Sequence, residues 1–158
     1  MDVLVRVAAD GALLVMVIVA GIVGVYHFVI RHRELFTQAV PLAIMAGLTS
    51  LLIGKMMSLV YQPSTVRPYI QQGVSAGASY IDNPGFPSDH VLLGAVIVLM
   101  LWALTPYRRV VLALTAILLV MAAGRVAALV HAPIDIAGGI IAALVGAVWY
   151  IKYHKHDK

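Results

Sequence analysis

The sequence predicts an all-α protein, a polytopic membrane helix bundle of about five transmembrane helices that forms one domain over residues 1–158. Hydrophobic residues make up 62% of the chain and charged residues 11%, a balance far from that of soluble domains. The apolar residues gather in runs of about 20, the length that a helix needs to cross the hydrocarbon core. Because each span uses that many residues, little of the chain is left for a second domain. The sequence contains no cysteine, which excludes disulfides and thiolate metal sites.

The first span is expected over residues 11–30, and we expect it to be retained rather than cleaved. A cleavable signal peptide has a basic start and a shorter apolar core, whereas this start, which carries Asp2, Arg6 and Asp10, is acidic and the apolar run has full spanning length. His27 lies near the end of the run. A single histidine at that position is typical of a packed or interfacial residue rather than a ligand.

The second span is expected over residues 38–61 and leads into the longest segment between spans, residues 62–87. Lys55 lies inside the span, a little over one turn from its end, where it either snorkels to the interface or binds an anion. A loop of this length in a small protein is typical of a lid or a binding segment. Arg67 follows the span directly, and residues 68–72 are expected to form a short interfacial helix that begins with proline.

The third span is expected to begin at Pro87-Ser88-Asp89-His90 and to end near Leu104. Proline presets the backbone angle, serine can bind free amide groups, and aspartate favours the positive end of the helix dipole. The first three residues are therefore explained as a helix start, but His90 is not. Since free amides at a helix start bind anions, His90 is expected to lie beside an anion cradle.

The fourth and fifth spans are expected over residues 110–130 and 133–151, with a basic turn before the fourth. Gly138, Ala142 and Gly146 stand four residues apart in the fifth span. Small residues at this spacing lie on one face of a helix and let a neighbouring backbone approach closely. The sequence therefore predicts tight helix packing against this face.

The segment that joins these two spans, residues 124–135, carries an arginine, a histidine and a carboxylate between two apolar runs. Ionisable groups at membrane depth are costly, so Arg125, His131 and Asp135 are candidates for a functional site. Asp135 follows His131 by four residues and falls in the first turn of the helix that Pro133 begins. Its carboxylate can therefore reach back to a ring N–H of the histidine and fix the tautomer.

The distribution of charge predicts how the chain crosses the membrane. Five spans put the termini on opposite sides, and the basic clusters between spans fall on the side of the C-terminus, which the positive-inside rule assigns to the cytoplasm. These residues are Arg31, Arg33, Arg108, Arg109, Lys152, Lys155 and Lys158. The N-terminus is therefore expected outside, and the net charge of +4 reflects topology rather than nucleic-acid binding. His154 and His156 are expected in a solvated tail rather than a metal site.

The same topology gathers six residues that can bind an anion or transfer a proton at the outer surface. They are Arg67, Ser88, His90, Arg125, His131 and Asp135. Guanidinium groups bind phosphate oxygens in bidentate fashion and a helix start offers amides to the same anion, so the group predicts a phosphate site. Two histidines can divide the chemistry, one neutral as nucleophile and one protonated as acid, because imidazole has an unperturbed pKa of about 6.5.

These residues resemble three signatures of the type 2 phosphatidic acid phosphatase superfamily, whose fold is shared with vanadium haloperoxidases and bacterial acid phosphatases. The corresponding segments, within residues 55–139, are Arg67-Pro68, then Pro87-Ser88-Asp89-His90, then Gly124-Arg125 with His131 and Asp135. The third signature normally begins with serine, where this chain has Gly124. The family often has a lysine where this chain has Val60, five residues after Lys55. Many members have six spans, so this chain looks one helix short, and a homo-oligomer could supply the missing wall.

The resemblance implies a role for each candidate residue. His131 would be the nucleophile that forms a phosphohistidine, Asp135 would orient it, and His90 would protonate the leaving group. The phosphoryl oxygens would be held by Arg67, Ser88, Arg125 and, as a further candidate, Lys55. No metal or other cofactor is expected.

Within this family, the chain looks most like bacterial undecaprenyl-diphosphatases, because of its small size, its outward site and the motif Phe86-Pro87-Ser88-Asp89-His90. Those enzymes remove one phosphate from the polyprenyl carrier of cell-wall synthesis. A phosphatase for phosphatidic acid or phosphatidylglycerol phosphate fits the same spacing and is the alternative. Both interpretations imply a lipid phosphate or diphosphate substrate, an integral protein of the cell (inner) membrane and an extracytoplasmic active site.

Two interpretations without hydrolysis remain open. A small b-type cytochrome could use His27, His90 or His131 as axial haem ligands, but two ligands must then lie at similar depth on facing helices. The predicted topology instead puts His27 near the inner face and the other two outside. A transporter of anionic lipids or phosphate could use the same arginines, and it would move its substrate without releasing phosphate.

Overall fold

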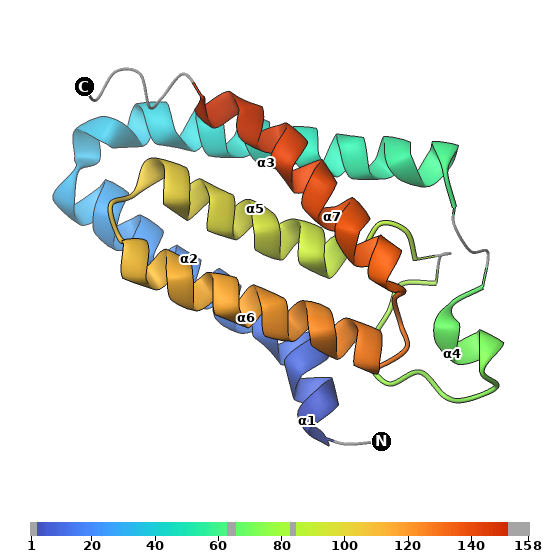
Figure 1. Ribbon diagram of the computed structural model, residues 1–158. Coiled ribbons are helices and arrows are strands. Elements are labelled where there is room, and N and C mark those ends of the chain that lie inside the picture. Colours follow the sequence, from blue (N-terminus) through green and yellow to red (C-terminus); the bar gives the residue numbers. More distant parts are fainter. Residues whose placement is uncertain (1–2, 63–65, 83–84, 152–158) are drawn as a thin grey trace.

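The computed structural model describes residues 3–62, 66–82 and 85–151, and every regular element in this part of the chain is a helix (Figure 1). In chain order these are α1 (Val3–Arg6), η1 (Val7–Gly11), α2 (Ala12–Gly24), η2 (Val25–Arg31), α3 (Arg33–Val60), α4 (Pro68–Gln71), α5 (Asp89–Leu104), α6 (Arg108–Ala127), α7 (Pro133–Gly146) and η3 (Ala147–Tyr150). The first two η elements are π-helical turns and the third is a 3₁₀ turn.

In the described part of the chain, four helical stretches are long and apolar enough to cross a membrane: Val3–Arg31, Arg33–Val60, Arg108–Ala127 and Pro133–Tyr150. The remaining predicted span corresponds to α5, an apolar helix of 16 residues. At 1.5 Å per residue α5 is roughly 24 Å long, slightly less than the hydrocarbon core. Figure 1 shows that the N-terminal end of α5 stops short of the adjacent end of α3. The predicted all-α polytopic bundle is confirmed.

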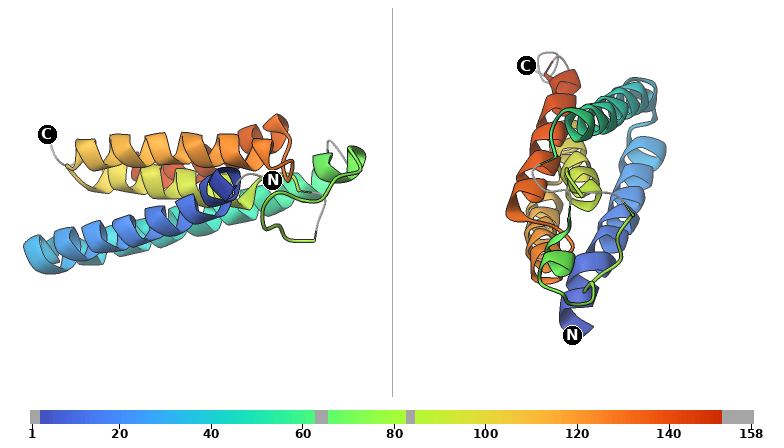
Figure 2. Two further views of the ribbon diagram at one scale, coloured as in Figure 1. Left: turned by 90° about the horizontal axis from the view of Figure 1, so that it is seen from below. Right: turned by 90° about the vertical axis from the view of Figure 1, so that its right-hand side faces the viewer.

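α5 lies at the centre of the bundle, where it packs against α2, α3, α6 and α7 (Figures 1 and 2). Val91, Leu92 and Leu101 on this helix are almost completely buried. A helix that is apolar on all its faces is typical of such an enclosed position. Because α5 is surrounded, its first turn, which carries His90, begins inside the bundle rather than at its edge.

The small residues of α7 make close contact with two neighbouring helices. A Cβ atom built on Gly139 would lie 2.8 Å from the Ser88 carbonyl oxygen, and one on Gly146 would overlap the side chain of Ser50 on α3. Gly138, Ala142 and Gly146, the predicted face, are all buried. Backbone approach of this kind is what small residues at four-residue spacing allow. The predicted packing role of this face is confirmed.

The helix that carries the first predicted span begins before that span. Helical structure runs from Val3 to Arg31 and includes Asp10, whereas the span is expected over residues 11–30. An aspartate in an apolar run suggests a helix boundary, but here the carboxylate is paired inside the protein and the helix continues through it. The π-helical turn Val7–Gly11 that surrounds Asp10 has no signature in the apolar pattern.

The segment between α3 and α5 lies over one end of the bundle. α4 confirms the short helix predicted after the second span. Two backbone hydrogen bonds fasten the segment to the turn between α6 and α7: the Tyr69 N–H donates to the Leu129 oxygen and the Gly77 N–H to the Ala128 oxygen, both at 3.0 Å. The long segment is therefore attached to the chain around His131.

The opposite end of the bundle holds the turns α2–α3 and α5–α6, so Arg31 and Arg33 share this end with Arg108 and Arg109 (Figure 1). His27 is buried there and its Nδ1 lies 3.3 Å from the Tyr107 hydroxyl oxygen, so the prediction of a packed histidine is confirmed. The other predicted residues of this side lie outside the described residues; they are Lys152, His154, Lys155, His156 and Lys158.

Candidate active site

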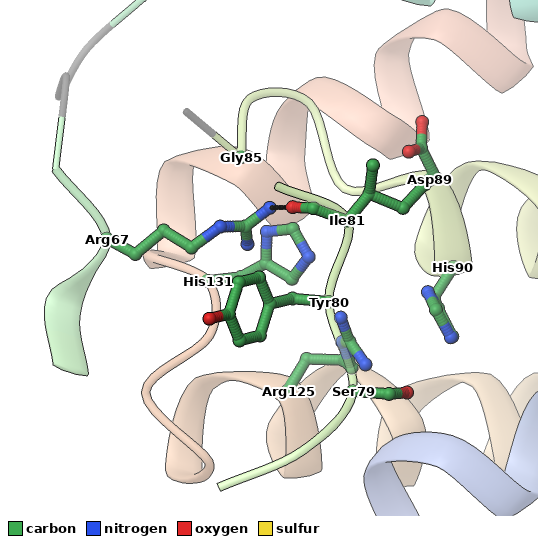
Figure 3. A pocket seen from close by; sticks show the side chains of 9 residues that line it. All are labelled: Arg67, Ser79, Tyr80, Ile81, Gly85, Asp89, His90, Arg125 and His131. Carbon is green, nitrogen blue, oxygen red and sulfur yellow. Dashed lines mark hydrogen bonds between the residues drawn. The ribbon is translucent and has the colours of Figure 1, made fainter. Parts of the chain in front are cut away.

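A pocket of about 190 Å³ opens where the segment between α3 and α5 meets α5, α6 and the turn before α7 (Figure 3). Its lining residues are Arg67, Ser79, Tyr80, Ile81, Gly85, Asp89, His90, Arg125 and His131. Four of the seven residues predicted for the site line this one pocket, although they come from three separate parts of the sequence.

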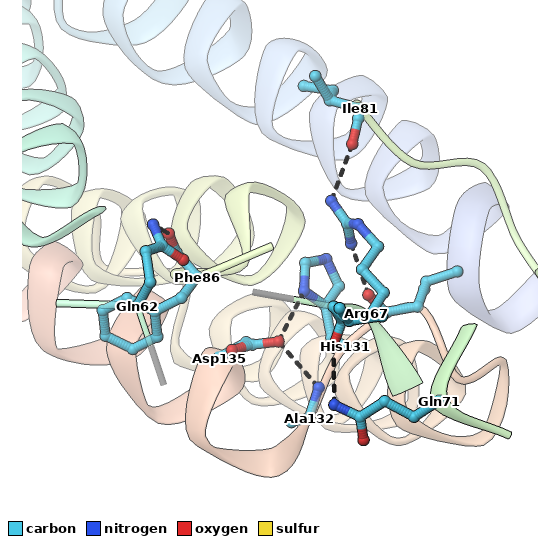
Figure 4. A network of polar contacts seen from close by, with 10 residues as sticks. Gln62, Arg67, Gln71, Ile81, Phe86, His131, Ala132 and Asp135 are labelled. Atoms are coloured by element: carbon cyan, nitrogen blue, oxygen red, sulfur yellow. Dashed lines mark hydrogen bonds and ion pairs between the residues drawn. The ribbon is translucent and has the colours of Figure 1, made fainter. Parts of the chain in front are cut away.

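His131 is held by the first turn of α7. Its Nδ1 lies 3.3 Å from Asp135 Oδ2, and the same carboxylate oxygen accepts the Ala132 backbone N–H at 2.8 Å (Figure 4). Both side chains are buried. Because the carboxylate engages Nδ1, it favours the tautomer with its proton there and leaves Nε2 with a lone pair.

Burial lowers the pKa of His131 from its ordinary value of 6.5, and the positive charges of Arg125 and Arg67 lower it further, while the hydrogen bond and the charge of Asp135 raise it. Burial dominates, because desolvation penalises the protonated ring. At neutral pH the imidazole is therefore neutral, the form that can act as a nucleophile.

Arg67 joins two loops at the pocket. Its side chain is 4% exposed, Nη1 donates to the Val130 carbonyl, and Nη2 donates to the Ile81 carbonyl at 2.9 Å (Figure 4). The guanidinium also lies over the Tyr80 ring, 5.1 Å from its centroid. Burial lowers the pKa of Arg67. These contacts hold the cation in one orientation beside His131.

Gly85 is required beside this guanidinium. Its φ of +104° lies in a region that other residues rarely adopt, and a Cβ atom there would lie 3.1 Å from Arg67 Nη1. The glycine thus lets the backbone pass close to the arginine at the pocket.

Arg125, in the last turn of α6, is paired with a residue that the sequence interpretation missed. Its Nη1 lies 2.9 Å from Asp10 Oδ1, and Asp10 Oδ2 accepts the Ser79 backbone N–H at 3.0 Å. Arg125 is only 1% exposed. The signal that could have found Asp10 was its position at the edge of an apolar run, since an ionisable group there is a site candidate by default.

The start of α5 contributes His90 and Asp89 to the pocket lining. Figure 3 shows the His90 ring in the pocket with His131, whereas the Asp89 carboxylate points away from both histidines. Ser88 is the N-cap residue, as predicted, but its side chain makes no capping bond. Its N–H donates to the Asp135 backbone carbonyl at 2.9 Å, which joins the start of α5 to the start of α7.

Two predicted phosphate ligands do not line the pocket. Ser88 is fully buried, and its Oγ has no hydrogen-bond partner among the described residues. Lys55 is exposed on α3. Its neighbour Gly54 faces the bundle, where a Cβ atom would lie 2.7 Å from Leu92 Cδ1. The structure therefore does not bring Lys55 to the other site residues.

The position of His27 argues against its use as a haem ligand together with His90 or His131. His27 packs against Phe28, His32 and Tyr107 at the end of the bundle opposite the pocket. It therefore does not face His90 or His131 as an axial partner would have to.

Comparison with known proteins identifies the family. A model of the PAP2 superfamily matches residues 12–158, which include every residue of the pocket. No curated protein and no solved structure matches the chain. Members of the superfamily are phosphatases, and the pocket contains the paired histidine, the second histidine and the two arginines that the resemblance assigned to phosphate chemistry. The chain therefore belongs to the PAP2 superfamily, as a membrane-embedded phosphatase of that family.

Proposed function

We propose that this protein hydrolyses a lipid phosphate or polyprenyl diphosphate, with undecaprenyl diphosphate as the favoured substrate, through a phosphohistidine on His131. The observation that carries the proposal is the His131 Nδ1–Asp135 Oδ2 contact of 3.3 Å at a pocket that Arg67, Arg125 and His90 also line. A neutral, oriented imidazole next to two guanidinium groups is the arrangement that attack on a phosphoryl group requires.

In the first step the lone pair of His131 Nε2 attacks phosphorus, and the bond from phosphorus to the leaving oxygen breaks. The leaving oxygen keeps the electron pair and takes a proton from His90. The developing imidazolium is stabilised by Asp135. Arg67 and Arg125 bind the nonbridging oxygens, where charge is distributed in the transition state.

In the second step a water molecule attacks phosphorus and gives a proton to His90, which is now neutral. The phosphorus–nitrogen bond breaks, inorganic phosphate leaves, and His131 returns to its neutral form. Each bond formed is matched by one broken, and His90 ends protonated as it began. This sequence uses one water molecule, four side chains that line the pocket and the carboxylate of Asp135, and it requires no metal ion.

An apolar groove beside the pocket supports a lipid substrate. The groove measures about 310 Å³ and is lined by Met56, Met57, Val60, Tyr61 and Phe86. Phe86 follows Gly85, which lines the pocket itself, so the groove lies next to the phosphate site. An amphiphile could then keep its tail against α3, on the membrane side, while its phosphate enters between the arginines.

We also propose an orientation, with the pocket on the extracytoplasmic side of the cell (inner) membrane and the C-terminus in the cytoplasm. The support is the basic cluster of Arg31, Arg33, Arg108 and Arg109 at the end of the bundle opposite the pocket. Cysteine labelling of intact cells at an introduced Ser79→Cys and at Glu34→Cys tests it. The first position should react with an impermeant reagent and the second should not.

The function is tested by phosphate release from undecaprenyl diphosphate, phosphatidic acid and phosphatidylglycerol phosphate in detergent, with EDTA present. Release from the first substrate is expected, with loss of activity in His131→Ala and His90→Ala. His32→Ala is the matched control, because His32 is exposed at the other end of the bundle. Preference for a glycerolipid would support the alternative substrate, and transport into vesicles without phosphate release would contradict hydrolysis.

The covalent intermediate has its own test. Rapid quenching with radiolabelled substrate should trap a phosphoprotein that is stable in alkali and labile in acid, as a phosphoramidate is. His90→Ala should still be labelled when the leaving group is a good one, whereas His131→Ala should not. Equal labelling of His131→Ala would contradict the assignment of the nucleophile.

A further inference from the structure

Asp10 is a half-buried partner of the site that the proposed mechanism does not use. It lies in the π-helical turn η1 within the first membrane span. Oδ1 accepts a hydrogen bond from Arg125 Nη1 at 2.9 Å, and Oδ2 accepts one from the Ser79 N–H at 3.0 Å. Both Arg125 and Ser79 line the pocket. The carboxylate therefore joins the first helix, the last turn of α6 and the segment over the pocket.

Gly124 makes this contact possible. A Cβ atom on Gly124 would lie 2.9 Å from the backbone nitrogen of Ala9 and 3.1 Å from the carbonyl carbon of Ala8. Distances this short to backbone atoms require the helix to move. Glycine at the position before Arg125, where the resembling signature normally has serine, thus lets η1 approach α6. Asp10, the next residue along η1, is thereby brought to the guanidinium.

The pairing leaves one edge of the guanidinium unused. Nη1 is engaged by Asp10, whereas Nε is buried and has no hydrogen-bond partner among the described residues. An arginine can bind two phosphate oxygens through an edge that includes Nε. A guanidinium that is 1% exposed also needs a compensating charge to stay in place before an anion arrives. Asp10 supplies that charge from the side of the first helix.

We infer that Asp10 is a positioning residue, which holds the Arg125 guanidinium so that its Nε edge is aligned with the phosphoryl oxygens. The inference rests on the proposed function, because it concerns the same phosphate site. Contacts from Arg125 matter most in the transition state, where charge on those oxygens is greatest. Loss of Asp10 therefore lowers kcat, and it weakens binding of vanadate, whose pentacoordinate form resembles that state.

The experiment compares full-length Asp10→Asn and Asp10→Ala with wild type in detergent. Asp82→Asn is the matched control, because Asp82 is an exposed carboxylate of the segment over the pocket. We expect kcat in the two Asp10 variants to fall by about tenfold to a hundredfold, somewhat less than loss of a whole charge-stabilising donor. The vanadate inhibition constant should rise in parallel, and Asp82→Asn should resemble wild type.

Two results would overturn the inference. Unchanged kcat with a lower melting temperature would make Asp10 a structural brace alone. Tighter inhibition by vanadate in Asp10→Asn would mean that the carboxylate competes with the anion instead of preparing its site. Failure of the proposed function is a separate outcome, since wild-type protein would then release no phosphate from any lipid tested.

A second variant covers the case in which Asp10 variants do not fold. Gly124→Ala should displace η1 and lower kcat, whereas Gly21→Ala should not, because a Cβ atom there has no neighbour within 4 Å. Where Asp10→Asn does fold, the two losses in the double variant Gly124→Ala/Asp10→Asn should be less than additive, since both act through the Asp10–Arg125 contact. Wild-type kcat in Gly124→Ala would contradict the inference.

Discussion

Asp135 Oδ2 lies 3.3 Å from His131 Nδ1 while accepting the Ala132 N–H at 2.8 Å, so one carboxylate oxygen caps the first turn of α7 and holds the histidine that precedes it. The helix start and the orientation of the ring are therefore one structural unit. Any change at Asp135 acts on the ring through its tautomer as well as through charge.

Asp135→Asn should retain the fold and lose most activity. The amide oxygen can take the place of Oδ2 and still accept both the Ala132 N–H and the His131 Nδ1–H, but it carries no negative charge to stabilise the imidazolium that develops as Nε2 attacks. We expect kcat to fall by a factor on the order of 10²–10³, the loss typical of removing one electrostatic contact to a developing charge. Steady-state kinetics with thermal unfolding checks this, and a loss below tenfold would contradict the stabilising role of the carboxylate.

As the pH is lowered, the rate of phosphoenzyme formation should begin to fall only below pH 6.5. Because burial lowers the pKa of His131 from 6.5, the neutral nucleophile persists to lower pH than a free imidazole would. The Asp135 hydrogen bond raises this pKa, so Asp135→Asn should move the acid limb of its residual activity to still lower pH. Single-turnover rates across the acid range measure both. An acid limb above pH 6.5 in wild type would contradict the burial argument.

Gly139→Ala should destabilise the protein and disturb the site. A Cβ atom there would lie 2.8 Å from the Ser88 carbonyl oxygen and 3.0 Å from the Leu92 backbone nitrogen, neither of which can rotate away. Overpacking of this kind costs roughly 1–3 kcal/mol. Thermal unfolding in detergent should show the loss, with Gly47→Ala as the control because its Cβ would meet nothing within 4 Å. Equal melting temperatures would contradict the close contact between α5 and α7.

Lys55→Met should leave kcat/KM near the wild-type value. Lys55 is exposed on α3 and does not line the pocket, whereas Arg67 does. Arg67→Lys is the contrasting variant: it keeps the charge but loses the fork that binds two carbonyls, and its kcat/KM should fall. A large loss in Lys55→Met would show that the side chain reaches the substrate from the membrane side.

Met57→Trp should discriminate between substrates with and without long tails. Met57 lines the groove on α3, so a bulkier side chain should raise KM for a long-chain lipid phosphate and leave a short soluble phosphate ester unaffected. Leu59→Trp is the matched control, because Leu59 lies on the same helix and is 76% exposed. An equal effect on both substrates would place the damage in the phosphate site rather than the groove.

Local signals predicted much of the fold and part of the site. The apolar runs identified the four long apolar helices of the described residues and the shorter α5, because a helix must reach a certain length to cross a membrane of nearly constant thickness. The start of α5 at Asp89 and the small face of α7 also followed from residue type and spacing. The four-residue spacing of His131 and Asp135 predicted their contact, since it depends on a single helical turn.

Contacts between residues on different helices could not be predicted from local signals. Asp10 and Arg125 are 115 residues apart, and their pairing depends on the rotation and depth of two helices and on the missing side chain of Gly124. Lys55 does not line the pocket for the same kind of reason, since the rotation of α3 turns Gly54 toward the bundle and leaves its neighbour exposed.

The sequence by itself therefore determined that the chain is a membrane helix bundle, where its spans lie, and that Arg67, His90, Arg125, His131 and Asp135 belong to one end of it. Only the tertiary structure decided which of the predicted residues meet in the pocket, that α5 is the central helix, and that an aspartate from the first span holds Arg125. The physical reason is that apolar length and short spacing are local properties of the chain. The facing of side chains across helices depends instead on close backbone packing of distant segments.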